Sequence, residues 1–231
     1  MIPIVSLANL LNAVVAFMIA ARAHSVDVQL AKDADHTIVH YFAWFFTAFG
    51  VMWFFYSLPG LFVTSLAAIT VAQFLADIAA YIAVAVGLRI TFFVLRQPVA
   101  EYMSTGFLIV LGTIYVIGRL YNFTLNEIEI IGPYIYYTPV VSPALQAITG
   151  VATSFGSIIF AGTFWGVYKK QRANVLVARR ALYLSIGMLC MFVASTLFFI
   201  LITPSFVTAS IAALFSLSGF FLLQRGIPYR E

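Results

Sequence analysis

The fold is decided by the stretch LFVTSLAAITVAQFLADIAAYIAVAVGLRITFF, residues 61–93, in which Asp77 and Arg89 are the only charged residues. A bilayer core about 30 Å thick needs about 20 apolar residues per helix, so this run is long enough to cross a membrane and either tilt or protrude. Six further apolar runs predict membrane helices at residues 2–21, 38–57, 103–123, 143–168, 178–202 and 206–223.

The composition points to the same class of protein. The chain is 63% hydrophobic and only 9% charged, which would leave a soluble domain of this size without a polar surface. We therefore predict an all-α, polytopic membrane protein: one seven-transmembrane-helix bundle that covers residues 1–231. The net charge of +4 does not indicate nucleic-acid binding, because the cations lie beside the membrane spans, where they orient helices and contact membrane lipids.

The cations also predict an orientation. Eleven of the twelve Lys and Arg residues occupy alternate gaps between the runs: Arg22, Lys32, Arg89, Arg96, Lys169, Lys170, Arg172, Arg179, Arg180, Arg225 and Arg230. By the positive-inside rule these gaps and the C-terminus are cytoplasmic, and the N-terminus is outside. The first cation follows the first run, unlike in a cleaved signal peptide, so we expect a retained first helix. We therefore predict an integral membrane protein, located in a prokaryotic plasma membrane.

The segment between the fourth and fifth runs, residues 122–142, is the longest one predicted outside. Its tyrosines, Tyr134, Tyr136 and Tyr137, suit the headgroup level, so we expect this segment to rest on the bilayer surface. All eight prolines fall at or near predicted helix ends, so no span is expected to be interrupted. Broken helices are typical of many secondary transporters and are not predicted here.

Asp77 is the leading candidate for a functional residue, because a carboxyl near mid-bilayer is costly and usually faces the bundle interior. It needs a partner or a proton. Gln73 and Tyr81 are one turn away on the same helix face, and Asn9 and Asn12 place amides in the first run. We predict a buried polar cluster of Asn12, Gln73, Asp77 and Tyr81 that binds a ligand or relays protons, with Asp77 protonated and donating a hydrogen bond. The alternative is an interhelical hydrogen bond without further function.

Arg119 lies within the fourth run near its outer end and is a candidate counterion for Asp77. It sits about six residues from the middle of that run, which is roughly 9 Å along a helix and argues against a direct bond. The alternative is that Arg119 reaches the outer headgroups, or that it contacts Gln146 and Asn122.

A metal site has weaker support. His36 and His40 have the i, i+4 spacing that can chelate a metal on one helix face, but a third ligand of defined spacing is missing. A helix start capped by Asp35 or Thr37 is the favoured interpretation. Cys190 is the only cysteine, so it forms no intrachain disulfide, and we predict no cofactor.

Small residues follow one face of the fifth run, where Ala152, Gly156, Gly162 and Gly166 form small-xxx-small steps. They predict close packing against another helix. That helix belongs either to the same chain or, through Gly162 and Gly166, to a second copy of it.

Two families of seven-helix proteins invite comparison. Microbial rhodopsins hold retinal through a lysine in helix seven, and here the only lysines are Lys32, Lys169 and Lys170, so a rhodopsin is excluded. The chain instead resembles the seven-helix N-terminal membrane input region of some bacterial histidine kinases and related sensors. The resemblance rests on three features: a short first helix before a cationic joint, a second helix with Trp44 and Trp53, and the basic segment at residues 169–182. The given sequence departs from the kinase pattern because it ends at Glu231, just after the seventh run. The resemblance therefore implies signalling through a partner, a fragment, or a stand-alone relative with another task.

These observations leave four functional classes. The leading hypothesis is a non-enzymatic, receptor-like sensor that binds a small or lipid-like ligand near Asp77. It would present a basic joint to a cytoplasmic protein partner, through Lys169, Lys170, Arg172, Arg179 and Arg180. The alternatives are an accessory subunit of a membrane complex, a proton or ion channel or carrier that uses Asp77, and an intramembrane enzyme, for which the sequence contains no nucleophile or nucleotide-binding motif.

Overall fold

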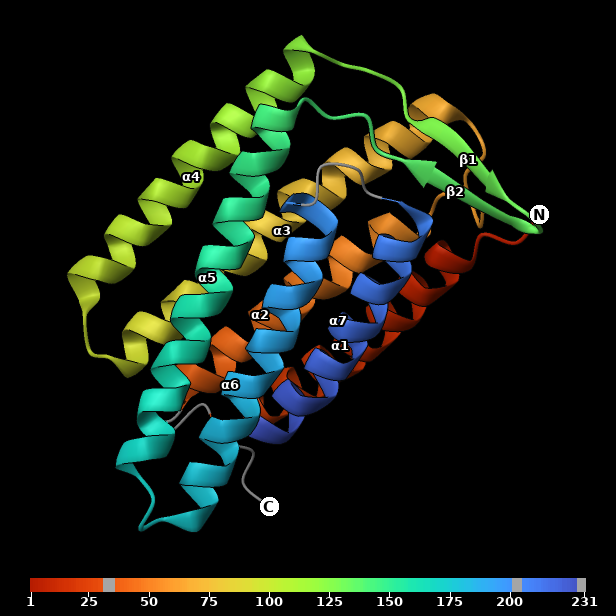
Figure 1. Cartoon of the computed structure of the whole chain (residues 1–231). Helices are drawn as coiled ribbons and strands as arrows, with labels where there is room; N and C mark the ends of the chain where they lie inside the picture. The colour runs from red at the N-terminus through yellow and green to blue at the C-terminus, as the bar shows by residue number, and fades with distance from the viewer. Residues whose placement is uncertain (31–35, 201–204, 228–231) are drawn as a thin grey trace.

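Seven long helices form the body of the molecule, as Figure 1 shows for a computed structural model that describes residues 1–30, 36–200 and 205–227. The helices are α1 (Ile4–Leu30), α2 (His36–Ser57), α3 (Leu66–Val94), α4 (Pro98–Tyr121), α5 (Pro143–Lys170), α6 (Val175–Ser195) and α7 (Phe206–Gly226). All seven are long and apolar enough to cross a membrane, which confirms the prediction of an integral membrane helical bundle.

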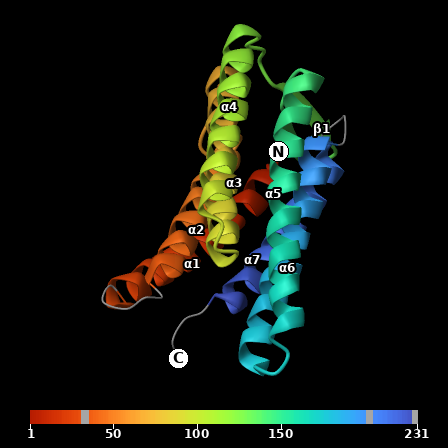
Figure 2. The ribbon, with the colours of Figure 1, turned by 90° about the vertical axis from the view of Figure 1, so that its left-hand side faces the viewer.

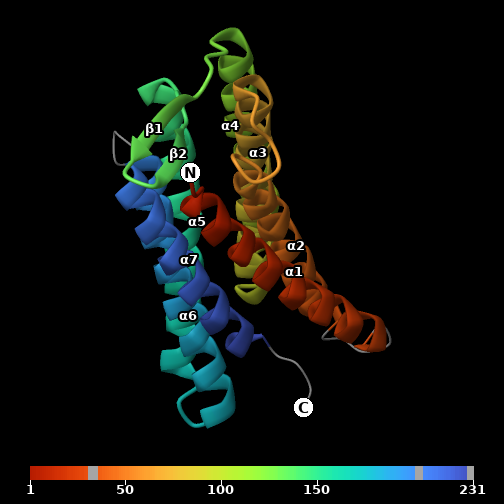
Figure 3. The same cartoon turned by 90° about the vertical axis from the view of Figure 1, so that its right-hand side faces the viewer.

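The two ends of the bundle differ in character. The N-terminus and a β-hairpin lie at one end, here named the hairpin end, and α7 finishes at the other (Figures 1 and 3). The other end, here named the basic end, carries the α3–α4 and α5–α6 turns with Arg96 and Arg172. The predicted outside and cytoplasmic sides correspond to the hairpin and basic ends, and that orientation stays a prediction.

Several helix bounds differ from the predicted ones for local reasons. α1 continues past Arg22 to Leu30, because Asp27 is held by His40 of α2 at 2.8 Å. α3 begins at Leu66, because residues 58–65 form a turn in which Gly60 adopts a φ of 71° and donates to the Val63 carbonyl. α4 begins at Pro98, which fits the first helical position, where no amide hydrogen is needed.

The sixth span is continuous but changes its helix type near its end. Its α-helix ends at Ser195 and continues as a π-helical turn, Thr196–Ile200. The hydroxyls of Ser195 and Thr196 both donate to the Phe192 carbonyl, at 3.0 and 2.9 Å, and so compete with the backbone ladder. Single π-helical turns in long helices are frequent at functional sites.

The segment after α4 folds into a hairpin of β1 (Glu127–Ile131) and β2 (Tyr134–Thr138), an element that the sequence analysis missed. Gly132, with a φ of 59°, and Pro133 form the two-residue turn. The hairpin pairs with the N-terminus, since Ile2 donates to the Pro133 carbonyl at 2.8 Å. Tyr136 and Tyr137 are buried in protein, so the expectation that they lie at the bilayer surface is wrong for these two tyrosines, whereas Tyr134 is partly exposed.

The core toward the basic end is aromatic. Phe45 packs edge-on against Phe49 with ring centroids 4.8 Å apart, and Phe160 lies 4.6 Å from Phe164. The other rings of this cluster are Phe42, Phe46 and Phe220, all fully buried. These rings come from α2, α5 and α7, so they join the two groups of helices that Figures 2 and 3 show side by side.

α6 and α7 pack backbone to backbone at one crossing. A Cβ added at Gly219 would lie 2.9 Å from the carbonyl oxygen of Gly187, and one added at Gly187 would lie 3.0 Å from that of Gly219. Backbone atoms cannot move aside as a flexible side chain can, so only glycine fits at this crossing.

We therefore expect Gly219→Ala to lower the free energy of unfolding by about 1–3 kcal/mol through overpacking. Gly162→Ala on α5 is the matched control, because a Cβ there meets nothing within 4 Å. It should be neutral, or stabilising by up to about 1 kcal/mol through helix propensity. The stability of both variants is measured by thermal melting in detergent, with size-exclusion chromatography used to monitor the folded fraction. Equal melting of Gly219→Ala and wild type would contradict the close contact.

Candidate functional site

Asp77 joins three helices through its two carboxyl oxygens. It lies on α3, eleven residues after Leu66 and hence roughly 17 Å from the start of that helix at 1.5 Å per residue. Its side chain is buried, with 8% of its surface exposed. The Tyr56 hydroxyl of α2 donates to one oxygen and the Tyr115 hydroxyl of α4 donates to the other.

The partners of Asp77 differ from the predicted ones, since the hydroxyls of Tyr56 and Tyr115 lie at its two oxygens. That Asp77 is protonated and donates a hydrogen bond stays a prediction. Two phenol donors suit an ionised carboxylate, which only accepts, and hydrogen bonds to a charged group are the stronger kind. They offset part of the cost of placing a carboxyl within a membrane.

The same face of α3 continues toward the hairpin end with Thr70 and Gln73. Gln73 donates to the Tyr137 carbonyl of β2 at 3.1 Å and accepts from the Asn126 side chain at 2.5 Å. The Asn126 backbone amide donates to the Thr70 hydroxyl at 3.1 Å. Residues 70, 73 and 77 are spaced to share one helix face, so one polar stripe docks the hairpin and binds the tyrosines.

Arg119 of α4 holds the two chain segments that flank the hairpin. Its Nη1 donates to the Val140 carbonyl at 2.5 Å and to the Thr124 hydroxyl at 3.3 Å. Only 2% of the residue is exposed, so the expectation that Arg119 reaches outward to the headgroups is wrong. Its Nε is buried and has no hydrogen-bond partner among the described residues.

A small polar cavity of about 20 Å³ lies between these groups. It is lined by side chains of five helices and the loop before α5: Tyr56, Gln73, Asp77, Tyr115, Arg119, Pro139, Val141, Gln146, Thr149, Phe198 and Phe199. Asp77 and Arg119 therefore share one cavity, with two amides and three hydroxyls around them.

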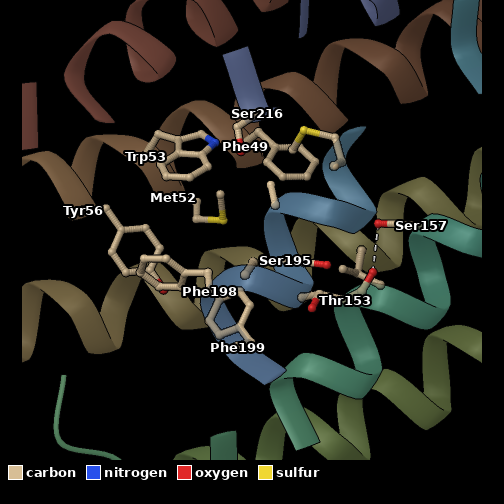
Figure 4. Close-up of a pocket in the computed structure, with 14 residues that line it drawn as sticks. Phe49, Met52, Trp53, Tyr56, Thr153, Ser157, Ser195, Phe198, Phe199 and Ser216 are labelled. Carbon is tan, nitrogen blue, oxygen red and sulfur yellow. Dashed lines mark hydrogen bonds between the residues drawn. The ribbon is translucent and has the colours of Figure 1, made fainter. Parts of the chain in front are cut away.

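A second, apolar cavity of about 50 Å³ adjoins the first (Figure 4). Phe49, Met52 and Trp53 of α2 line one side, and Met191 and Ala194 of α6 line another. Two buried polar atoms also belong to its lining residues, Trp53 Nε1 and Ser216 Oγ, and neither has a hydrogen-bond partner among the described residues. Figure 4 shows the indole nitrogen of Trp53 turned toward Ser216.

Three aromatic side chains line both cavities: Tyr56, Phe198 and Phe199. The two phenylalanines belong to the π-helical turn, and Tyr56 is a donor to Asp77. The ring centroids of Tyr56 and Phe198 are 5.2 Å apart at 67°, an edge-to-face contact. The wall between the cavities thus connects the carboxyl on α3 to the irregular end of α6.

The structure brings together only part of the predicted cluster. Gln73 and Asp77 line the polar cavity, but Asn12 donates to the Ala213 carbonyl of α7 at 3.0 Å and joins α1 to α7 instead. Asn9 donates to the Tyr56 carbonyl at 3.2 Å. Tyr81 is hydrogen-bonded to Thr149 of α5 at 3.1 Å.

The candidate metal ligands also have other roles. Both ring nitrogens of His40 are hydrogen-bonded, one to Asp27 at 2.8 Å and the other to the Trp44 indole at 3.1 Å. The side chain of His36 lies outside the described residues. In the described part of the chain, no group of three His, Cys, Asp or Glu residues could hold a metal ion.

Small residues on α5 divide between two environments. Gly156 packs against α3, since a Cβ there would lie 2.6 Å from Val84 Cγ1, so this part of the face contacts the same chain. A Cβ at Gly162 or Gly166 would meet nothing within 4 Å. Contact with a second copy through these two glycines stays a prediction.

Tyr56 and Tyr115 were not predicted from the sequence as partners of Asp77. Tyr115 precedes Arg119 by one helical turn, so the spacing already placed a phenol on the face of an intramembrane arginine. Tyr56 precedes the Pro59-Gly60 turn, where the chain reverses toward α3. Both signals were present in the sequence, but neither says which tyrosine reaches the carboxyl.

No family model, curated protein or solved structure matches this chain. A functional assignment therefore depends on the geometry of the site.

We expect Tyr115→Phe to lower the free energy of unfolding by about 0.6–2 kcal/mol, because one Asp77 oxygen loses its donor. Tyr121→Phe on the same helix is the matched control, since that side chain is 89% exposed and should be neutral. In Asp77→Asn the cost of Tyr115→Phe should shrink, because the two residues act as a pair. Purely additive effects in this double-mutant cycle, measured by reversible unfolding in detergent, would argue against the bond.

Proposed function

We propose that this protein is a non-enzymatic, receptor-like membrane sensor that binds a small, mainly apolar ligand in the paired cavities beside Asp77. The observation that carries the proposal is that two residues lining the apolar cavity, Trp53 and Ser216, have buried polar atoms without a hydrogen-bond partner among the described residues. Buried polar groups are nearly always hydrogen-bonded, so such atoms need a partner. A ligand with one acceptor atom would supply it.

The lining defines the chemistry of that ligand. Phe49, Met52 and Met191 favour an aliphatic or aromatic body, and methionines adapt to irregular shapes. Trp53 Nε1 is a donor only and a serine hydroxyl can donate, so a carbonyl, ether or hydroxyl oxygen fits between them. On the polar side, Arg119 Nε is a third donor without a partner among the described residues.

The size of the cavities indicates how binding would become a signal. A cavity of about 50 Å³ holds only a few water-sized groups, each of which needs about 10–15 Å³. A larger ligand must displace the wall formed by Tyr56, Phe198 and Phe199. Two of these residues belong to the π-helical turn, so binding would favour another arrangement at the hairpin end of α6.

α6 runs from this turn to the basic end, where it carries Arg179 and Arg180. It contacts α7 at Gly187 and Gly219, where the two backbones leave no room for a side chain between them. A change at the π-helical turn would therefore move α6 and α7 together. The basic joint with Lys169, Lys170 and Arg172 would present that change to a cytoplasmic protein partner.

The aromatic core favours a sensor over a proton or ion carrier. From Asp77 toward the basic end, the interior contains the rings of Phe42, Phe45, Phe46 and Phe160, each 1% exposed or less. These four rings offer no relay group and leave little room for water. A carrier would need this layer to open at every cycle, whereas a sensor needs it closed.

We expect short linear ketones and alcohols to raise the melting temperature of the purified protein, whereas alkanes of the same length should not. A ligand stabilises the state that it binds, so binding raises the melting temperature. The ketones and alcohols differ from the alkanes only in having an acceptor oxygen. Ser216→Ala and Asp77→Asn should each reduce the shift by at least half. Ser218→Ala is the matched control on α7, because its hydroxyl is bonded to the Leu214 carbonyl on the exposed side.

Two outcomes would contradict the proposal. One is equal stabilisation by alkanes and ketones, which would indicate dissolution in the detergent micelle. The other is an unchanged shift in Ala194→Leu, which fills the apolar cavity from α6 and keeps every polar group.

A further inference from the structure

A cluster of arginines at the basic end forms a pocket unrelated to the cavities beside Asp77. Its volume is about 450 Å³, within the range typical of small-molecule sites. Four arginines from three helices line it: Arg22 of α1, Arg179 and Arg180 of α6, and Arg225 of α7. The remaining lining residues are Leu176, Tyr183, Gln224 and Ile227.

We propose that this pocket binds the phosphate group of an anionic phospholipid headgroup. Arginine guanidinium groups match phosphate oxygens in paired hydrogen bonds, and basic pockets between membrane helices hold anionic headgroups. Tyr183 and Gln224 add a hydroxyl and an amide as neutral donors. Leu176 and Ile227 give the pocket an apolar border, where the glycerol and the first acyl carbons would lie.

The electrostatics of α6 support an anion at this place. The first turn of α6 contains no acidic residue, although a helix N-terminus carries partial positive charge and favours negative groups. Arg179 and Arg180 add two positive charges only one turn further along, where they oppose the helix dipole. An anionic ligand would offset both effects.

Other cations at this end contact residues that do not line the pocket. Lys169 lies over the Trp165 ring and Arg172 over the Tyr168 ring, with the charged groups 5.6 and 5.7 Å from the ring centroids. Arg89 pairs with Glu101 at 3.7 Å. The described lining residues of the pocket include no acidic side chain. Arg22 and Arg180 each make a further interaction, so neither is free, and the proposal depends chiefly on Arg179 and Arg225.

The location fits a lipid better than a soluble anion. The lining residues of the pocket come from α1, α6 and α7 at the predicted cytoplasmic side, where anionic lipids are concentrated. A free phosphate ion would use the arginines but not the apolar border. The shared chemistry is the phosphate group, so the experiment separates the two sources.

The test uses the full chain in neutral detergent with three additives: phosphatidylglycerol, phosphatidylcholine of the same acyl chains, and inorganic phosphate. We expect phosphatidylglycerol, at about 100-fold above its Kd, to raise the melting temperature by roughly 5–10 °C. Phosphatidylcholine and inorganic phosphate should give less than half of that shift. High salt should reduce the effect, because the pocket is open to solvent.

Variants assign the effect to the pocket. Arg179→Gln combined with Arg225→Gln should remove most of the shift, and each single variant should remove part of it. If the double variant does not fold, Arg225→Gln and Arg225→Lys provide the comparison, since lysine keeps the charge but loses the paired geometry. Arg172→Gln is the matched control outside the pocket, and the shift should be retained in it. The shift caused by phosphatidylglycerol should also be retained in Asp77→Asn, which would show that this site is distinct from the one at the hairpin end.

Three results would overturn the proposal. An equal shift with phosphatidylcholine would remove the selectivity for an anionic headgroup, and an equal shift with inorganic phosphate would assign the pocket to a soluble anion. The same loss in Arg172→Gln as in the double variant would indicate a general surface charge, as expected for a site that binds an acidic protein.

Discussion

The acceptance of two phenol hydrogen bonds by Asp77 is the constraint on which the rest of the structure depends. A carboxyl at this depth cannot be left without donors, because a membrane interior supplies no water. The donors come from α2 and α4, which flank α3, so satisfying one side chain sets the rotation of three helices. α3 is therefore the central element of the bundle, and its polar stripe determines which face of each neighbour turns inward.

That stripe also explains why the hairpin end is closed. Thr70 and Gln73 hold the hairpin, and Arg119 holds the two segments that flank it, so a cover of irregular chain lies over the polar cavity. Irregular backbone near a membrane needs such side-chain partners, since its own polar groups are not paired as they are in a helix. Burial raises the pKa of Tyr136 in β2, so its hydroxyl stays protonated beneath this cover.

Much of the fold could be predicted from the sequence because membrane helices are local features. The seven apolar runs and the alternating cations can be recognised from the length and charge of each segment alone. The structure confirms the seven helices. The hairpin was missed although Gly132-Pro133 lies between two short runs rich in isoleucine and tyrosine, since the tyrosines were assigned to the headgroups. The partners of Asp77 could not be predicted, because they depend on which faces of α2 and α4 meet α3. Asn12 shows the same limit: its depth suggested Asp77, but the rotation of α1 directs it to α7.

The two proposed sites lie at opposite ends of the same pair of helices. The cavities beside Asp77 include Phe198, next to α6, and Ser216 of α7, and the basic pocket includes Arg179 of α6 and Arg225 of α7. Between them, the helices pack backbone to backbone at Gly187 and Gly219, where there is no room for a Cβ. Coupling between two sites is reciprocal. If a ligand at the hairpin end shifts α6 and α7 and so changes the affinity for an anionic headgroup by some factor, the headgroup must change the affinity for that ligand by the same factor. A bundle of this kind would report on a small molecule and on the charge of its membrane through one mechanical element.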